Sequence, residues 1–151
     1  MLGQQVMDRP AATGPGSKAS RWLRIVPWAA QIGVAGILAQ TLFFKFTYAP
    51  ETQVIFADRG GRPAATAVGI VELICVVLLL VPRTSAAGAA LALLTIGGAI
   101  FTHLTSLGIA IVDPTTGESD GGLLFGLALA VAVGSLIVLA FRWRRLPLIS
   151  H

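Results

Sequence analysis

The most constraining feature of the sequence is an apolar stretch with one carboxyl group at its centre. Residues Ala64 to Pro82 form a run of 19 residues in which Glu72 is the only acidic or basic side chain. An α-helix rises 1.5 Å per residue, so about 20 residues cross the roughly 30 Å hydrocarbon core of a bilayer. Glu72 would then lie near the membrane centre, where an ionised carboxylate costs about 2.5–3.5 kcal/mol or more. We therefore interpret Glu72 either as part of a functional site or as half of a buried structural pair.

The composition places the whole chain among integral membrane proteins. Its 151 residues are 55% hydrophobic and 12% charged, whereas soluble domains carry about 25% charged residues. The net charge is +4, but the Lys and Arg residues flank apolar runs and form no stripe with interleaved aromatic residues. We therefore expect the lipid bilayer as a partner, and no nucleic acid. One cysteine, Cys75, and two histidines provide neither a disulfide nor the spacing of a metal site.

Three more apolar runs complete a set of four predicted transmembrane helices, and the fold class is all-α. The expected spans are 25–44, 64–82, 86–112 and 121–141. The short segment Pro82–Ser85 between the second and third spans predicts an antiparallel hairpin. The third run is long enough to span with tilt, or to break near Gly108. Between the first two spans, Pro50 is typical of a helix start and Gly60 of a helix end, which predicts a short interfacial helix.

The two ends of the chain differ from the membrane domain, which we place at residues 21–145. Residues 1–20 are polar and lack the apolar region of a signal peptide, so we predict a disordered cytoplasmic tail there. Residues 146–151 form a second, short tail. With both termini in the cytoplasm, eight of the eleven Lys and Arg residues lie inside. This arrangement satisfies the positive-inside rule for a multi-pass protein of the cell (inner or plasma) membrane.

Three side chains are costly at their predicted depth, and they make up the candidate intramembrane polar site: Lys45, Glu72 and His103. All three would lie in the outer half of one bundle, where antiparallel packing favours Glu72 and His103 as neighbours. Each also has a structural interpretation. Lys45 at a helix end usually extends to the headgroups, Glu72 can be protonated or paired with Lys45, and His103 can be a neutral ring bonded to a carbonyl. We assign no catalytic residue and no metal.

Other polar and small residues predict contacts between helices. Gln31 lies 14 residues before Lys45 and shares its helix face, so we treat it as a secondary polar residue that bonds across helices. In the last span, small residues recur at every fourth position, which lets a neighbouring helix approach closely. This small-residue stripe consists of Gly122, Gly126, Ala130 and Gly134.

The sequence resembles the DoxX-like family of small four-helix membrane proteins. The resemblance covers about residues 23–141 and is carried by three features. The first span ends in FFKF with Lys45, a Gly-x-x-Glu motif at Gly69 and Glu72 opens the second, and the small-residue third span carries His103 near its end. Val81-Pro82 replaces the glycine often found in the turn after the second helix of the family. Some relatives are membrane subunits of oxidoreductase systems, including a thiosulfate:quinone oxidoreductase.

The resemblance implies an accessory or quinone-interacting subunit of a membrane-associated oxidoreductase system. Glu72 and His103 would then bind a quinone carbonyl or relay its protons, with Lys45 setting the electrostatic potential, and an oxidoreductase partner would supply electrons. The alternative is a non-enzymatic scaffold or assembly partner, whose buried Glu, His and Lys residues are structural. In that case the small-residue stripe would serve internal packing or contact another subunit, including a second copy in a homo-oligomer.

Overall fold

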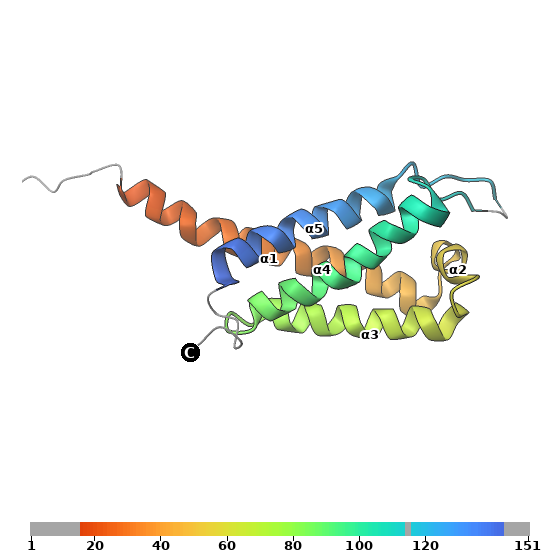
Figure 1. Ribbon diagram of the computed structural model, residues 1–151, viewed down its shortest axis with the longest axis horizontal. Helices are drawn as coiled ribbons and strands as arrows, with labels where there is room; N and C mark the ends of the chain where they lie inside the picture. Colours follow the sequence, from red (N-terminus) through yellow and green to blue (C-terminus); the bar gives the residue numbers. More distant parts are fainter. Residues whose placement is uncertain (1–15, 114–115, 144–151) are drawn as a thin grey trace, which may run out of the picture.

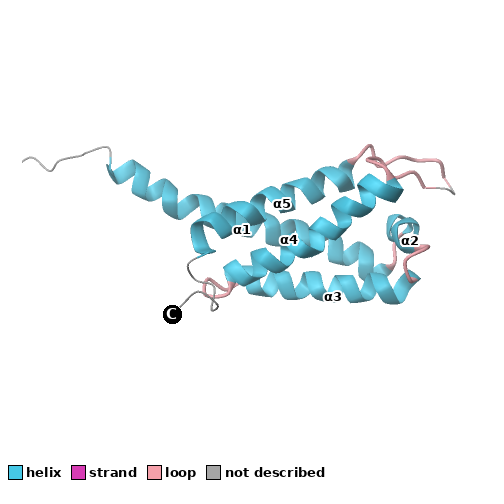
Figure 2. Ribbon diagram, viewed as in Figure 1, coloured by secondary structure: helices cyan, strands magenta, loops and turns pink. Residues whose placement is uncertain are grey.

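The chain forms an all-helical bundle. The computed structural model describes residues 16–113 and 116–143, with side chains described from residue 21. Its helices are α1 (Gly16–Thr47), α2 (Pro50–Phe56), α3 (Gly61–Leu80), α4 (Ser85–Thr102), the π-helix η1 (His103–Leu107) and α5 (Leu123–Arg142). Figures 1 and 2 show the long helices packed along one another. Within the described ranges there is no β-strand, only an isolated bridge between Val112 and Ser119. The predicted all-α class is confirmed.

Among the residues that the structure describes, four helical segments are long and apolar enough to cross a membrane, and each overlaps one of the four predicted spans. They are Arg21–Thr47, Gly61–Leu80, Ser85–Leu107 and Leu123–Arg142. Within an apolar stretch of 18 residues from each segment, only 22–33% of the residues are buried inside the bundle. Most apolar side chains therefore point outward. Leu94, for example, is 76% exposed. An apolar surface of this extent is stable against lipid and costly in water.

The boundaries of the predicted segments differ from the structure in three places. α1 begins at Gly16, so the last five residues of the tail predicted as disordered are helical, while 1–15 and 146–151 lie outside the described residues. The third helix ends before Gly108, which confirms the second of the two predicted alternatives, a break near this residue. Gly108 has φ +80°, a left-handed value that stops a helix, and residues 109–112 are not helical. The short predicted helix is α2, which starts at Pro50 but ends at Phe56.

The bundle is a square in which each long helix contacts two neighbours. α1 packs against α3 and α5, and α4 packs against the same two helices. Two glycines allow the closest contacts. A Cβ atom at Gly134 would lie 2.5 Å from Val34 of α1, and one at Gly88 would lie 2.8 Å from the backbone nitrogen of Leu79 in α3. The contact at Gly88 confirms the predicted α3–α4 hairpin.

We call the end of the bundle with the α3–α4 turn (residues 81–84) the hairpin end, and the end with α2 and residues 108–122 the loop end. At the hairpin end, side chains from other helices donate to carbonyl groups in the last turn of α3 and in the turn that follows it. The Gln31 amide donates to Leu79 O, and the Arg142 guanidinium donates to Pro82 O at 3.4 Å. The Arg142 guanidinium also lies 5.2 Å from the Trp28 ring centre. These bonds tie α1, α3 and α5 together, and the Gln31 bond confirms its predicted interhelical role.

Candidate functional site

A buried ion pair joins α1 to α3 in the loop-end half of the bundle. Lys45 Nζ lies 2.9 Å from Glu72 Oε2, and the two side chains are 16% and 5% exposed. The Thr41 hydroxyl lies 3.2 Å from the same carboxylate oxygen, one helical turn before Lys45. Of the interpretations open from the sequence, pairing of Lys45 with Glu72 is confirmed, and extension of Lys45 to the headgroups is wrong. The physical reason is that leaving the buried Glu72 carboxylate without a counter-charge costs more free energy than removing the Lys45 ammonium from water.

Gly69 explains how Lys45 reaches Glu72. It lies one turn before Glu72 on α3, and a Cβ atom there would meet the Phe46 ring at 3.2 Å and Lys45 Cβ at 3.5 Å. The missing side chain lets the end of α1 approach α3 closely. Cys75, one turn beyond Glu72, is fully buried in the apolar core. It therefore contributes to the packing of the core.

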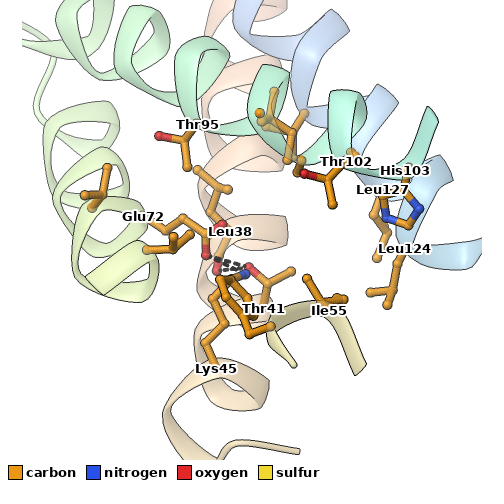
Figure 3. Close-up of a pocket in the computed structure, with 18 of the residues that line it drawn as sticks. Leu38, Thr41, Lys45, Ile55, Glu72, Thr95, Thr102, His103, Leu124 and Leu127 are labelled. Atoms are coloured by element: carbon orange, nitrogen blue, oxygen red, sulfur yellow. Dashed lines mark hydrogen bonds and ion pairs between the residues drawn. The ribbon is translucent and has the colours of Figure 1, made fainter. Parts of the chain in front are cut away.

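The ion pair forms part of the wall of a cavity of about 530 Å³ that is bounded by all four long helices and α2 (Figure 3). The cavity wall is mostly apolar, with Ile, Leu, Val and Ala side chains from each long helix. Its polar members are Lys45, Glu72, Thr41, Thr95, Thr102, His103 and Arg59. Small-molecule sites typically have volumes of about 300–1,000 Å³ and combine an apolar lining with a few polar groups. This cavity has both properties.

His103 lies in the wall of the same cavity but is separated from the ion pair. Its ring Nδ1 donates to Gly108 O at 2.8 Å, and Gly108 N donates to His103 O at the same distance. Because a carbonyl can only accept, Nδ1 carries the proton and Nε2 of the neutral ring is an acceptor. The predicted bond of the His103 ring to a backbone carbonyl is confirmed. η1 begins at His103, and π-helical turns are frequent at functional sites.

Glu72 and His103 are not in contact, so their prediction as neighbours is wrong. Figure 3 shows Glu72 beside Lys45 and Thr41, with His103 on the other side of the cavity near Leu124 and Leu127. The physical reason is the path of α4, which meets α3 at the hairpin end and diverges from it toward the loop end (Figure 1). At the loop end His103 packs instead on α5, with its ring centre 5.5 Å from that of Phe125.

Asp120 binds backbone groups of the loop end and lies near His103. Its carboxylate accepts hydrogen bonds from the backbone N–H groups of Ile111 at 2.7 Å, Gly122 at 3.0 Å and Leu124 at 3.1 Å. Burial alone would raise the pKa of Asp120, but these three N–H groups and the nearby His103 together lower that pKa below its usual value. Asp120 also lines a smaller cavity of about 150 Å³, whose wall includes Lys45 and Glu51. Lys45 thus borders both cavities.

Replacing Asp120 with asparagine should remove stability that depends on pH. Because the pKa is lower in the folded chain, the charge stabilises the fold fully above the unfolded pKa of about 3.9 and loses this effect as the pH falls through the folded value. Unfolding temperatures of wild type and Asp120→Asn in detergent should therefore differ by a constant amount above about pH 5 and converge below about pH 4. Glu118→Gln, an exposed change in the same loop, is the control. A difference that is the same at every pH would contradict this role.

The small-residue stripe serves internal packing only in part. Gly134 packs against Val34 of α1, as predicted. Gly126 and Ala130 are exposed, and a Cβ atom at Gly126 would meet nothing within 4 Å. Gly122 precedes α5 and has φ +83°, so it shapes the loop rather than a helix contact. The four residues therefore do not share one role. Gly134 serves packing inside the bundle, Gly126 and Ala130 lie on the outer surface of α5, and Gly122 belongs to the loop before α5.

No protein-family model, curated protein or solved structure matches this chain. The function of the site is therefore argued from its own geometry.

Three residues of the site were not predicted from the sequence. Thr41 has a signal in hindsight, since it lies four residues before Lys45 and so shares its helix face. Asp120 lies three residues before the first residue of α5, where an acidic side chain is typical of a helix start. Arg59, which lines the cavity and donates to Ile55 O at 2.9 Å, carries no such signal, because its place depends on how α2 folds over the bundle.

Proposed function

We propose that this chain is a DoxX-like multi-pass protein of the cell membrane that binds a quinone as an accessory subunit of a membrane oxidoreductase system. The positive-inside rule supports a topology with both termini in the cytoplasm, which makes the loop end the extracytoplasmic end. The three residues that carry the family resemblance, Lys45, Glu72 and His103, all line one cavity. Their shared position supports a common role in binding.

The observation that carries this proposal is an apolar cavity with a charged pair in its wall. A quinone ring is apolar on its faces and accepts hydrogen bonds at two carbonyl oxygens on opposite edges. Lys45 supplies a donor on one side of the cavity, and it is held inside the bundle by Glu72 at 2.9 Å. His103 lies on another side, where its Nε2 accepts from the hydroxyl of a quinol or, when protonated, donates to a quinone carbonyl. The residues present fit this ligand class.

Bound quinone would supply the redox chemistry, since it takes up two electrons and two protons to become a quinol. The side chains of this chain hold and move protons. Glu72 and Lys45 fix the charge on one side of the cavity, while His103 with Asp120 near it offers a proton donor and acceptor toward the loop end. The electrons would come from a partner oxidoreductase, because Lys, Glu and His side chains carry none.

A scaffold is the second candidate function, and two observations favour it. The Lys45–Glu72 pair compensates both charges within the chain, as a purely structural pair would. Gly126 and Ala130 leave a small-residue surface on α5 that another helix can approach, from a partner or from a second copy. In this case the buried pair fixes helix register, and loss of Glu72 would lower assembly and stability without changing ligand binding.

Photolabelling in membranes tests the quinone proposal. Benzoquinone and naphthoquinone probes that carry a photoreactive group on the ring should label peptides from α4 and the start of η1 (95–103) and from α5 (124–131), which line the cavity. Excess unlabelled quinone should compete for this labelling. Labelling spread evenly over the outward-facing residues of the four spans, without competition, would contradict the proposal and favour the scaffold.

A further inference from the structure

Two of the residues that line the cavity lie on the outer surface of the bundle. Among the residues that line it, the two that are exposed are Ala67 on α3 and Gly98 on α4, while the remainder are buried or partly buried. A lining residue that is also exposed marks where the cavity meets the outside. The opening therefore lies between α3 and α4.

The path of the two helices explains the opening. α3 and α4 are in contact at the hairpin end. Because Gly88 has no side chain, the backbone of α4 packs directly against Leu78 and Leu79 of α3. From there they diverge, and Figure 1 shows α2 at the wide end of the resulting wedge. α2 covers part of this wedge with Ile55 and Phe56, which line the cavity. The part that α2 leaves uncovered lies deeper, along the helices.

The depth of the opening places it in the hydrocarbon region. Ala67 is six residues from the start of α3, about 9 Å along the helix at 1.5 Å per residue. Gly98 is four residues before the end of α4, about 6 Å by the same rise, and η1 continues the span to Leu107. Both residues are therefore inside the apolar spans and not at their ends. Val68 and Val71 on α3 and Ala99 on α4 also line the cavity.

We propose that this gap is a lateral portal, and that the ligand is an amphiphile whose ring lies in the cavity while its long apolar tail extends through the portal into the bilayer. Gly98 sets the width of the portal, because it has no side chain and a Cβ atom there would meet nothing within 4 Å. A larger residue at this position fits the fold and occupies the space that the tail needs. This inference rests on the proposed quinone site and defines its substrate class as long-tailed.

Gly98→Phe and Gly97→Phe form a matched pair of variants. Gly97 is the adjacent residue of α4, is also exposed and also has open space for a Cβ atom, but it does not line the cavity. Binding is measured at equilibrium in nanodiscs with tail-less benzoquinone and naphthoquinone rings and with the same rings carrying decyl tails. Gly98→Phe should weaken binding of the tailed probes by about tenfold or more, because the tail loses its apolar groove. Binding of the tail-less rings should change by less than about threefold, and Gly97→Phe should leave both unchanged.

Ala67→Phe narrows the portal from α3 and serves as the second variant if Gly98→Phe does not fold. The portal is contradicted if both variants bind tailed probes as wild type does, if Gly98→Phe weakens tailed and tail-less probes equally, or if Gly97→Phe has the same effect as Gly98→Phe. Failure of the quinone proposal itself has a different signature, since wild type would then bind neither the tailed nor the tail-less rings.

Discussion

Replacing Lys45 with methionine should destabilise the fold by about 3–5 kcal/mol, because it leaves the buried Glu72 carboxylate without its counter-charge. Methionine keeps the length and apolar stem of lysine, so the change removes the charge and little packing. Glu72 is 5% exposed, and among the described residues its remaining hydrogen-bond partner would be the Thr41 hydroxyl at 3.2 Å. The carboxyl must then stay charged at a high cost or bind a proton.

Glu72→Gln should cost less, because Lys45 has an alternative that Glu72 lacks. Lys45 lies in the last turn of α1 and is 16% exposed, so its flexible stem can carry the ammonium toward the loop-end surface. The double variant Lys45→Met with Glu72→Gln should regain most of the stability lost in Lys45→Met, since it buries no unpaired charge. The free energy of unfolding, measured by SDS titration in mixed micelles, gives the coupling between the two residues.

Arg62→Met is the control for this series. Arg62 is an exposed basic residue near the same end of α3, with its guanidinium 5.9 Å from the Tyr48 ring centre, and its loss should cost about 1 kcal/mol or less. If Lys45→Met is as mild as Arg62→Met, or if the double variant is no more stable than Lys45→Met alone, the pair does not stabilise the bundle as described.

The helices could be predicted from the sequence because the bilayer leaves few alternatives. A run of about 20 apolar residues must satisfy its backbone polar groups internally, and a helix is the way a single segment does so. The hairpin at Pro82–Ser85 and the start of α2 at Pro50 also follow from local signals. The start of α1 at Gly16 did not follow, since the polar residues before Arg21 carry no apolar period.

The three candidate site residues were predicted, and pairing of Lys45 with Glu72 was one of the alternatives, but the favoured neighbours, Glu72 and His103, were wrong. Charge and depth identify Glu72, Lys45 and His103 one at a time, whereas their contacts depend on how helices cross. Because the second and third spans form an antiparallel hairpin, the sequence favoured Glu72 and His103 as neighbours. The wedge between α3 and α4 separates them, and Gly69 brings Lys45 to Glu72 instead. The cavity also results from the divergence of α3 and α4. Neither the ion pair nor the cavity can therefore be predicted from the hydrophobic periodicity of a single helix.

Glu72→Gln should also abolish most quinone binding, and this effect is the second large one expected. The carboxylate holds Lys45 at the cavity wall, and without it the ammonium can move toward the loop-end surface, so the ring loses its fixed donor. Loss of one charge-assisted hydrogen bond in an apolar site lowers affinity by about tenfold or more. Glu118→Gln, at an exposed loop position, should leave quinone binding unchanged.

The most direct measurement of the central claim is the quinone content of the native protein after purification in a gentle detergent. Mass spectrometry of extracted quinones and lipids, together with the co-purifying proteins, would be compared for wild type, Glu72→Gln and Glu118→Gln. We expect wild type and Glu118→Gln to retain a long-tailed quinone in near-stoichiometric amount and Glu72→Gln to lose it while remaining folded. A wild-type protein that carries only bulk phospholipid would contradict the claim and leave the Lys45–Glu72 pair as a structural element of a scaffold.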